Sequence, residues 1–141
     1  MNGKNIGYWI TTALVALAFL SGGVMDASRN ADVQAGMSHL GYPLYFALIL
    51  GVWKFLGGVA VLAPGFARLK EWAYAGMAFD LTGAAFSHAS SGDGAGKIVT
   101  PLVIFALVVA SWALRPASRK LASNASESKA DARAPGAVQP A

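Results

Sequence analysis

The stretch Leu48–Gly65, LILGVWKFLGGVAVLAPG, reads as one apolar helix that carries a lysine, Lys54, near its middle. The apolar run covers 43–63, and the Pro-Gly pair that follows it is typical of a helix end. Crossing the hydrocarbon core of a membrane takes about 20 helical residues at about 1.5 Å each. The stretch therefore predicts a membrane span with a charge at its centre, where a charge needs a partner or a function.

Three further apolar stretches have a similar length and cover 7–25, 71–89 and 98–114. The stretch 71–89 is the least apolar, and it fits a helix whose polar side chains face the interior of a bundle. Hydrophobic residues make up 55% of the chain and charged residues 13%, against about 25% in a soluble domain. We therefore expect an all-α fold, a transmembrane four-helix bundle over residues 1–116.

After Pro116 the composition changes to Ala, Ser, Pro and charged residues, which predicts a disordered cytoplasmic tail over 117–141. Lys and Arg are concentrated on one side of the four predicted spans, and only Arg29 and Lys97 fall on the other side. This bias predicts an integral membrane protein with both termini in the cytoplasm. The net charge of +4 then reflects topology, and nucleic acid is not an expected partner.

The first apolar stretch has a second interpretation. Lys4 precedes it and the small residues 21–23 follow, as in a cleaved signal peptide. Cleavage of the stretch 7–25 would leave only three spans, so we favour the interpretation in which this first span is retained.

Lys54 and Asp80 lie near the middle of their predicted helices, and so at almost the same depth in the membrane. Gly51 and Gly58 share the helix face of Lys54, while Gly76 and Gly83 share that of Asp80. Small residues let membrane helices approach closely. These four glycines therefore predict that the two helices pack together and form an intramembrane Lys54–Asp80 pair. The pair has either a structural role or a role in binding a proton or a ligand.

A second polar group is expected near the outer surface, where Asp26, His39 and His88 fall at the ends of predicted spans. Its residue types resemble a metal set, but the spacing matches no ligand motif, so no metal site is predicted. Histidines at helix ends more commonly cap backbone carbonyls, and a polar outer vestibule that holds water or a headgroup is the alternative. On the inner side, Arg68 and Lys70 are expected to set topology or to hold lipid headgroups. The chain has no cysteine and no catalytic or nucleotide-binding motif.

Three patterns carry a resemblance to a known family: K-x-L-G-G from Lys54, P-G-x-x-x-L-K-E-W-A-Y-A-G from Pro64, and T-G-A-x-x-S-H from Thr82. Together they resemble the DoxX-like family of small four-helix bacterial membrane proteins over residues 4–116. Phe55 stands where the family more often has leucine. The family name comes from subunits linked to quinol oxidation and thiosulfate:quinone oxidoreduction, and the cysteines of some redox-linked relatives are absent here.

Three functions are compatible with these features. The first is a non-enzymatic membrane protein that binds a lipid- or quinone-like molecule or supports a membrane redox complex. The second is a proton-coupled transporter or channel that uses Lys54 and Asp80. The third is an accessory subunit of a quinone-linked oxidoreductase. The expected surroundings are the lipid bilayer, with a membrane redox partner or a second copy of the chain as further partners. No resident cofactor is predicted, and quinone is the one candidate that the resemblance raises.

Overall fold

The computed structural model describes residues 3–121. These residues form five α-helices and one short 3-10 helix, without any strand among them. In chain order the helices are α1 (Gly3–Ser28), α2 (Ala31–Leu40), α3 (Leu44–Leu62), α4 (Ala67–Ser90), α5 (Ala95–Leu114) and the 3-10 helix η1 (Ala117–Arg119). The all-α prediction is confirmed. The structure has five α-helices where four were predicted, because the short helix α2 forms between the first two long helices.

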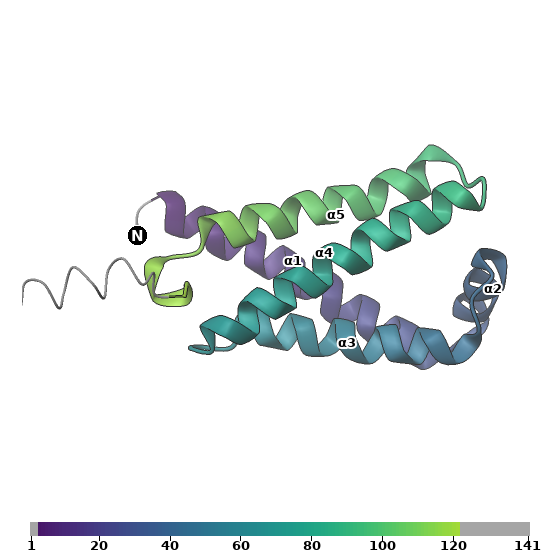
Figure 1. Ribbon diagram of the computed structural model, residues 1–141, viewed down its shortest axis with the longest axis horizontal. Helices are drawn as coiled ribbons and strands as arrows, with labels where there is room; N and C mark the ends of the chain where they lie inside the picture. The colour runs from purple at the N-terminus through teal and green to yellow at the C-terminus, as the bar shows by residue number, and fades with distance from the viewer. Residues whose placement is uncertain (1–2, 122–141) are drawn as a thin grey trace, which may run out of the picture.

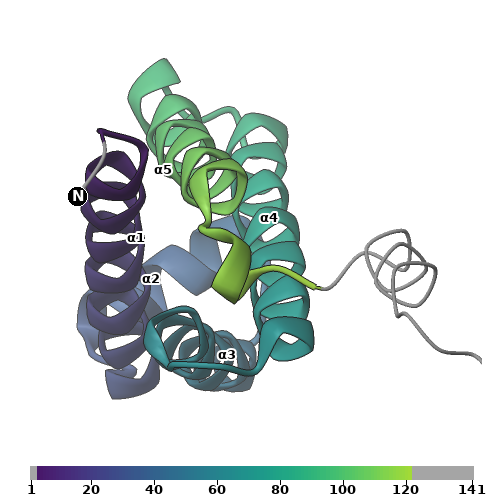
Figure 2. The ribbon, with the colours of Figure 1, turned by 90° about the vertical axis from the view of Figure 1, so that its left-hand side faces the viewer.

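The four long helices run along the length of an elongated bundle (Figure 1). The short helix α2 lies at one end, called here the α2 end, and the N-terminus and η1 lie at the other, the terminal end. Seen along the bundle, α1 lies between α3 and α5, and α4 completes the ring opposite α1 (Figure 2). The contact between α1 and α3 is the most extensive, and that between α3 and α4 is much smaller. The bundle is therefore tight on one side and loose on the other.

The sequence contains the signals that begin and end α2. The side chain of Asn30 accepts a hydrogen bond of 3.0 Å from the backbone N–H of Val33, which is a typical N-cap. Gly41 follows the helix with a φ of 77°, a left-handed conformation in which glycine carries no Cβ penalty. The connection in which the chain reverses direction between α1 and α3 therefore contains a helix of 10 residues.

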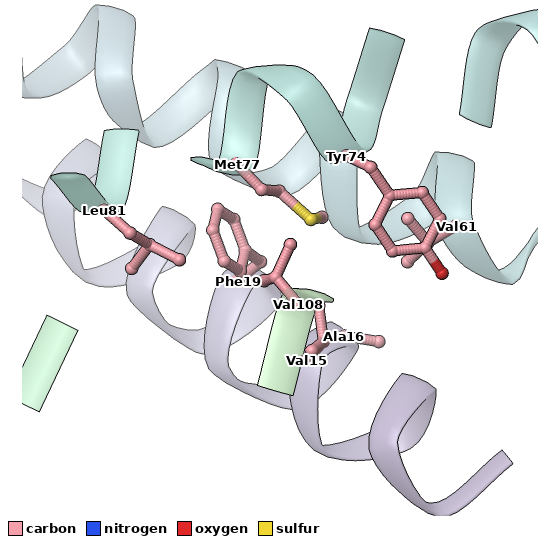
Figure 3. Packing of buried hydrophobic residues seen from close by; sticks show 8 residues of the cluster. All are labelled: Val15, Ala16, Phe19, Val61, Tyr74, Met77, Leu81 and Val108. Atoms are coloured by element: carbon pink, nitrogen blue, oxygen red, sulfur yellow. The ribbon is translucent and has the colours of Figure 1, made fainter. Parts of the chain in front are cut away.

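The core lies where α1, α4 and α5 meet (Figure 3). Phe19 of α1 lies among Met77 and Leu81 of α4 and Val108 of α5. The complete buried cluster consists of Val15, Ala16, Phe19, Val61, Tyr74, Met77, Leu81 and Val108. Burial of these side chains fixes α4 against α1 and α5, and so fixes the face that α4 turns towards α3.

A chain of buried hydroxyl groups runs through the same core. The Ser111 hydroxyl is 2.7 Å from the hydroxyl of Thr12 and 2.7 Å from the phenol oxygen of Tyr74. Each of the three polar groups is thereby satisfied away from water. The chain ties α5 to α1 and to α4.

Within the described residues, α1, α3 and α5 are long and apolar enough to cross a membrane. Helix α4 has 24 residues, which at about 1.5 Å each is long enough, but its charged side chains set it apart from the other three. The membrane-spanning character predicted for 43–63, 98–114 and the first stretch is therefore supported by the helices themselves.

Order extends beyond Pro116, where the predicted tail begins. Ala117–Arg119 form η1, and the Arg119 guanidinium donates hydrogen bonds of 3.1 Å to the Tyr8 hydroxyl and to the carbonyl oxygen of Val61. These contacts close the terminal end of the bundle. The remainder of the predicted disordered tail, 122–141, lies outside the described residues.

Candidate functional site

Close packing of α1 on α3 creates the first part of the site. A Cβ atom added to Gly51 would lie 2.6 Å from the backbone nitrogen of Ala27 and 2.7 Å from the carbonyl oxygen of Gly23. Added to Gly58, it would lie 2.9 Å from the side chain of Leu20. The glycine face of α3 therefore packs against α1, whereas the sequence predicted that it packs against α4. Gly23 is the matching glycine that the sequence analysis did not use.

This register brings Asp26 of α1 next to Lys54 of α3. The Lys54 ammonium donates a hydrogen bond of 2.9 Å to Oδ2 of Asp26, and it lies 3.7 Å from Oδ2 of Asp80. The three side chains are between 16% and 24% exposed. We call Asp26, Lys54 and Asp80 the charged triad. Lys54 and Asp80 do lie together, but Lys54 has its hydrogen bond with a residue that the sequence analysis assigned to the outer cluster.

Gly76 and Gly83 of α4 do not take part in close helix packing. A Cβ atom added to either would have no atom within 4 Å apart from its chain neighbours and the backbone of its own helix. The stripe of small residues on α4 therefore faces open space. At Gly76 this space is a pocket.

The pocket lies between α3 and α4 and has a volume of about 370 Å³. Its walls are apolar or aromatic apart from Lys54 and Asp80, and Phe19 of α1 also contributes. The remaining lining residues are Leu50, Trp53, Leu56, Gly57, Ala60, Leu69, Trp72, Ala73, Gly76 and Met77. Such a pocket, with a few polar groups among apolar walls, has the character of a small-molecule site. We call it the α3–α4 pocket.

A second polar group lies at the α2 end and is centred on Asp93, in the turn between α4 and α5. Oδ2 of Asp93 accepts hydrogen bonds from His88 at 2.8 Å and from His39 at 3.0 Å, and Oδ1 accepts one from Lys97 at 2.9 Å. We call these four residues the Asp93 cluster. The two histidines of the predicted outer cluster thus lie together, but Asp93 joins them in place of Asp26.

A family model described as the DoxX-like family matches residues 10–111. The chain belongs to the DoxX-like family. The match confirms the resemblance carried by the three sequence patterns, and it covers the charged triad and the Asp93 cluster. No curated protein and no solved structure matches the chain.

In this DoxX-like protein the Asp93 cluster connects three helices. His39 comes from α2, His88 from α4 and Lys97 from α5. Hydrogen bonds from His88, Lys97 and His39, in that order of importance, hold the pKa of the Asp93 carboxyl well below its ordinary value of 3.8. The ionised carboxylate thereby fastens α2 to the turn between α4 and α5.

A pH dependence of stability follows from this lowered pKa. Because the pKa of Asp93 is lower in the folded than in the unfolded chain, its stabilising effect is complete above the ordinary value of 3.8 and is lost as the pH falls below it. Thermal unfolding in detergent should therefore show a lower Tm for Asp93→Asn than for the wild type at neutral pH, and the difference should shrink in acid. A difference that stays constant down to the lowest accessible pH would contradict this account.

At the terminal end, Lys70 has a structural role that the sequence analysis did not predict. Its side chain is fully buried, and its ammonium donates hydrogen bonds to the carbonyl oxygens of Ala60, at 2.9 Å, and of Ala63. Lys70 therefore caps the last carbonyls of α3 and is not available to a lipid headgroup. Arg68 is exposed, and a headgroup contact stays a prediction for it.

Glu71 and Arg115 close the same end of this DoxX-like bundle. The Arg115 guanidinium donates a hydrogen bond of 2.7 Å to Oε1 of Glu71, and the indole N–H of Trp112 donates one of 2.9 Å to Oε2. Arg115 also lies 5.0 Å from the ring centroid of Tyr74. These contacts tie the start of α4 to the end of α5 and occupy Arg115, as Lys70 and Arg119 are occupied by backbone carbonyls at the same end.

Within residues 3–121 no group of three or more His, Asp or Glu side chains is arranged to hold a metal ion. Both histidines of the Asp93 cluster bind the same carboxylate oxygen, so the geometry is that of a hydrogen-bonded cluster. Nothing in the described residues singles out a quinone over another amphiphile. The α3–α4 pocket with the charged triad is therefore the candidate functional site.

Proposed function

We propose that this DoxX-like protein crosses the bacterial cytoplasmic membrane four times and binds an amphiphile in the α3–α4 pocket without chemical conversion. The observation that carries the proposal is the pocket itself, an apolar space of about 370 Å³ with a lysine and an aspartate in its wall. An amphiphile can place its hydrocarbon part against the apolar walls and its polar end at the charges. No catalytic motif in the sequence suggests an enzymatic reaction.

The exposed face of α4 supports its assignment as the fourth span. Trp72, Phe79 and Phe86 are spaced seven residues apart on one face, and each is at least 75% exposed. The polar side chains of the same helix point elsewhere: Tyr74 reaches the buried Ser111 hydroxyl, and Asp80 reaches Lys54. A helix with an aromatic outer face, whose polar side chains are turned towards the bundle interior, is suited to lie in lipid.

The distribution of cationic side chains supports an orientation with the terminal end in the cytoplasm. The terminal end holds Lys4, Arg68, Lys70, Arg115, Arg119 and Lys120. The α2 end holds only Arg29 and Lys97 among the described residues. Cytoplasmic loops carry the excess of Lys and Arg in membrane proteins, so both termini are assigned to the cytoplasm.

Native mass spectrometry of the protein purified in mild detergent tests the proposal. We expect a population with one bound amphiphile that survives removal of the detergent, because the pocket walls exclude water from the hydrocarbon part. Release of the bound molecule in organic solvent then identifies it. A protein that is uniformly free of bound molecules after purification from native membranes, in several detergents, would contradict the proposal.

A further inference from the structure

Among the described residues, none donates a hydrogen bond to Oδ2 of the Asp80 carboxylate. The Lys54 ammonium is engaged with Asp26 at 2.9 Å, and its distance of 3.7 Å from Oδ2 of Asp80 is beyond hydrogen-bond length. Oδ2 of Asp80 is buried and accepts no hydrogen bond from the described residues. A buried acceptor left without a donor costs free energy. The unmet acceptor therefore belongs to a carboxylate that lines the α3–α4 pocket.

The charges of the triad are also unbalanced. With all three side chains ionised, two carboxylates face one ammonium, which leaves one negative charge in excess. Every pocket-lining residue other than Lys54 and Asp80 is uncharged, so the walls do not compensate it. A positively charged donor at the Asp80 carboxylate would supply the missing charge through a charge-assisted hydrogen bond.

We propose that the amphiphile bound in the α3–α4 pocket carries a primary ammonium at its polar end and donates it to Asp80. This inference rests on the proposed amphiphile-binding function and adds the chemical class of the ligand. A bound ammonium brings the site to two charges of each sign, while Lys54 keeps its hydrogen bond with Asp26. A bound carboxylate would place three negative groups against one ammonium, and a neutral alcohol would leave the excess charge in place.

The aromatic side chains of the pocket add to this preference. Trp53 and Trp72 come from facing helices and both line the pocket that contains Asp80. Indole rings attract cations through their faces as well as packing against hydrocarbon. Both rings are largely exposed, so this contribution is secondary to that of the Asp80 charge.

Three probes of equal chain length separate the possibilities: dodecylamine, dodecanol and dodecanoate. They are offered together, at equal concentration and pH 8, to the full-length protein in a neutral detergent, and native mass spectrometry measures the bound fraction of each. We expect dodecylamine to bind at least about tenfold more tightly than dodecanoate, since hydrogen bonds to charged groups are the strong ones. Asp80→Asn should remove most of this preference, and Asp32→Asn, a matched change on the exposed surface of α2, should retain it.

Each outcome has one meaning. Equal binding of the three probes, or tighter binding of dodecanoate, to the wild type would overturn the ammonium inference and leave amphiphile binding intact. Binding of none of them, by a protein that also retains no native molecule, would overturn the proposed function. The wild-type comparison does not depend on the folding of any variant. If the folded Asp80→Asn variant retains the full preference for dodecylamine, Asp80 is not the group that binds the ammonium.

Discussion

Lys54→Met is expected to destabilise the protein by about 3 kcal/mol, the cost of leaving a buried charge without its partner. The substitution removes the one ammonium that, among the described residues, pairs with Asp26 and Asp80, and it keeps an unbranched apolar stem of nearly the same length. Two carboxylates then lie together, three-quarters or more shielded from solvent, with no positive charge between them. Unfolding by SDS in mixed micelles, followed by circular dichroism, measures the loss.

Lys97→Met is the matched control for this change. Lys97 also pairs with an aspartate at 2.9 Å, but its side chain is 61% exposed, so water replaces the lost contact and the effect should be much smaller. A double-mutant cycle then separates the two partners of Lys54. The hydrogen-bonded Asp26 should couple to Lys54 more strongly than Asp80 does. Equal effects of Lys54→Met and Lys97→Met would contradict a buried charged triad.

Gly51→Ala is expected to destabilise the protein by about 2 kcal/mol through overpacking, although alanine is the better helix former. The new methyl group would lie 2.6 Å from backbone nitrogen of Ala27, and backbone cannot move aside as a flexible side chain can. Helices α1 and α3 must therefore separate, which also draws Asp26 away from Lys54. The same SDS titration measures this loss.

Gly83→Ala is the corresponding control on α4. Its added methyl group meets no atom within 4 Å, so only the helix preference acts and a gain of about 0.5–1 kcal/mol is expected. The two glycine substitutions should therefore have opposite signs. A neutral or stabilising Gly51→Ala would mean that α1 and α3 are not in backbone contact.

The similar membrane depth and the proximity of Lys54 and Asp80 could be predicted from the sequence. The rise per residue fixes how deep each side chain lies along its helix, and the helical period fixes the face on which it lies. The sequence did not allow us to predict which helix packs against the glycine face of α3. That choice depends on Gly23, whose neighbours also fit the small residues of a signal-peptide cleavage site. Because the glycine face of α3 packs against α1, helix α4 packs only loosely on α3, and the pocket forms between α3 and α4.

Three other predictions from the sequence were incomplete or wrong, each for a local reason. The helix α2 was readable from its caps, Asn30 and Gly41, but a short polar segment between two apolar runs resembles a loop. His39 and His88 were placed at the same end of the bundle, whereas Asp93 stands in a glycine-rich turn without any periodicity. The burial of Lys70 was not predictable, because a basic residue between two spans has the composition of a topology signal. A redox partner and a homo-oligomer remain predictions.

The α3–α4 pocket as the amphiphile site is tested most directly by Gly76→Leu and Gly83→Leu. Both glycines lie on α4 with open space at the Cβ position, but only Gly76 lines the pocket. Leucine at position 76 would project into the pocket and take up part of its volume, and leucine at 83 adds the same side chain elsewhere. Native mass spectrometry should show the bound amphiphile in the wild type and Gly83→Leu and its loss from Gly76→Leu. Equal retention by all three folded proteins would contradict the account.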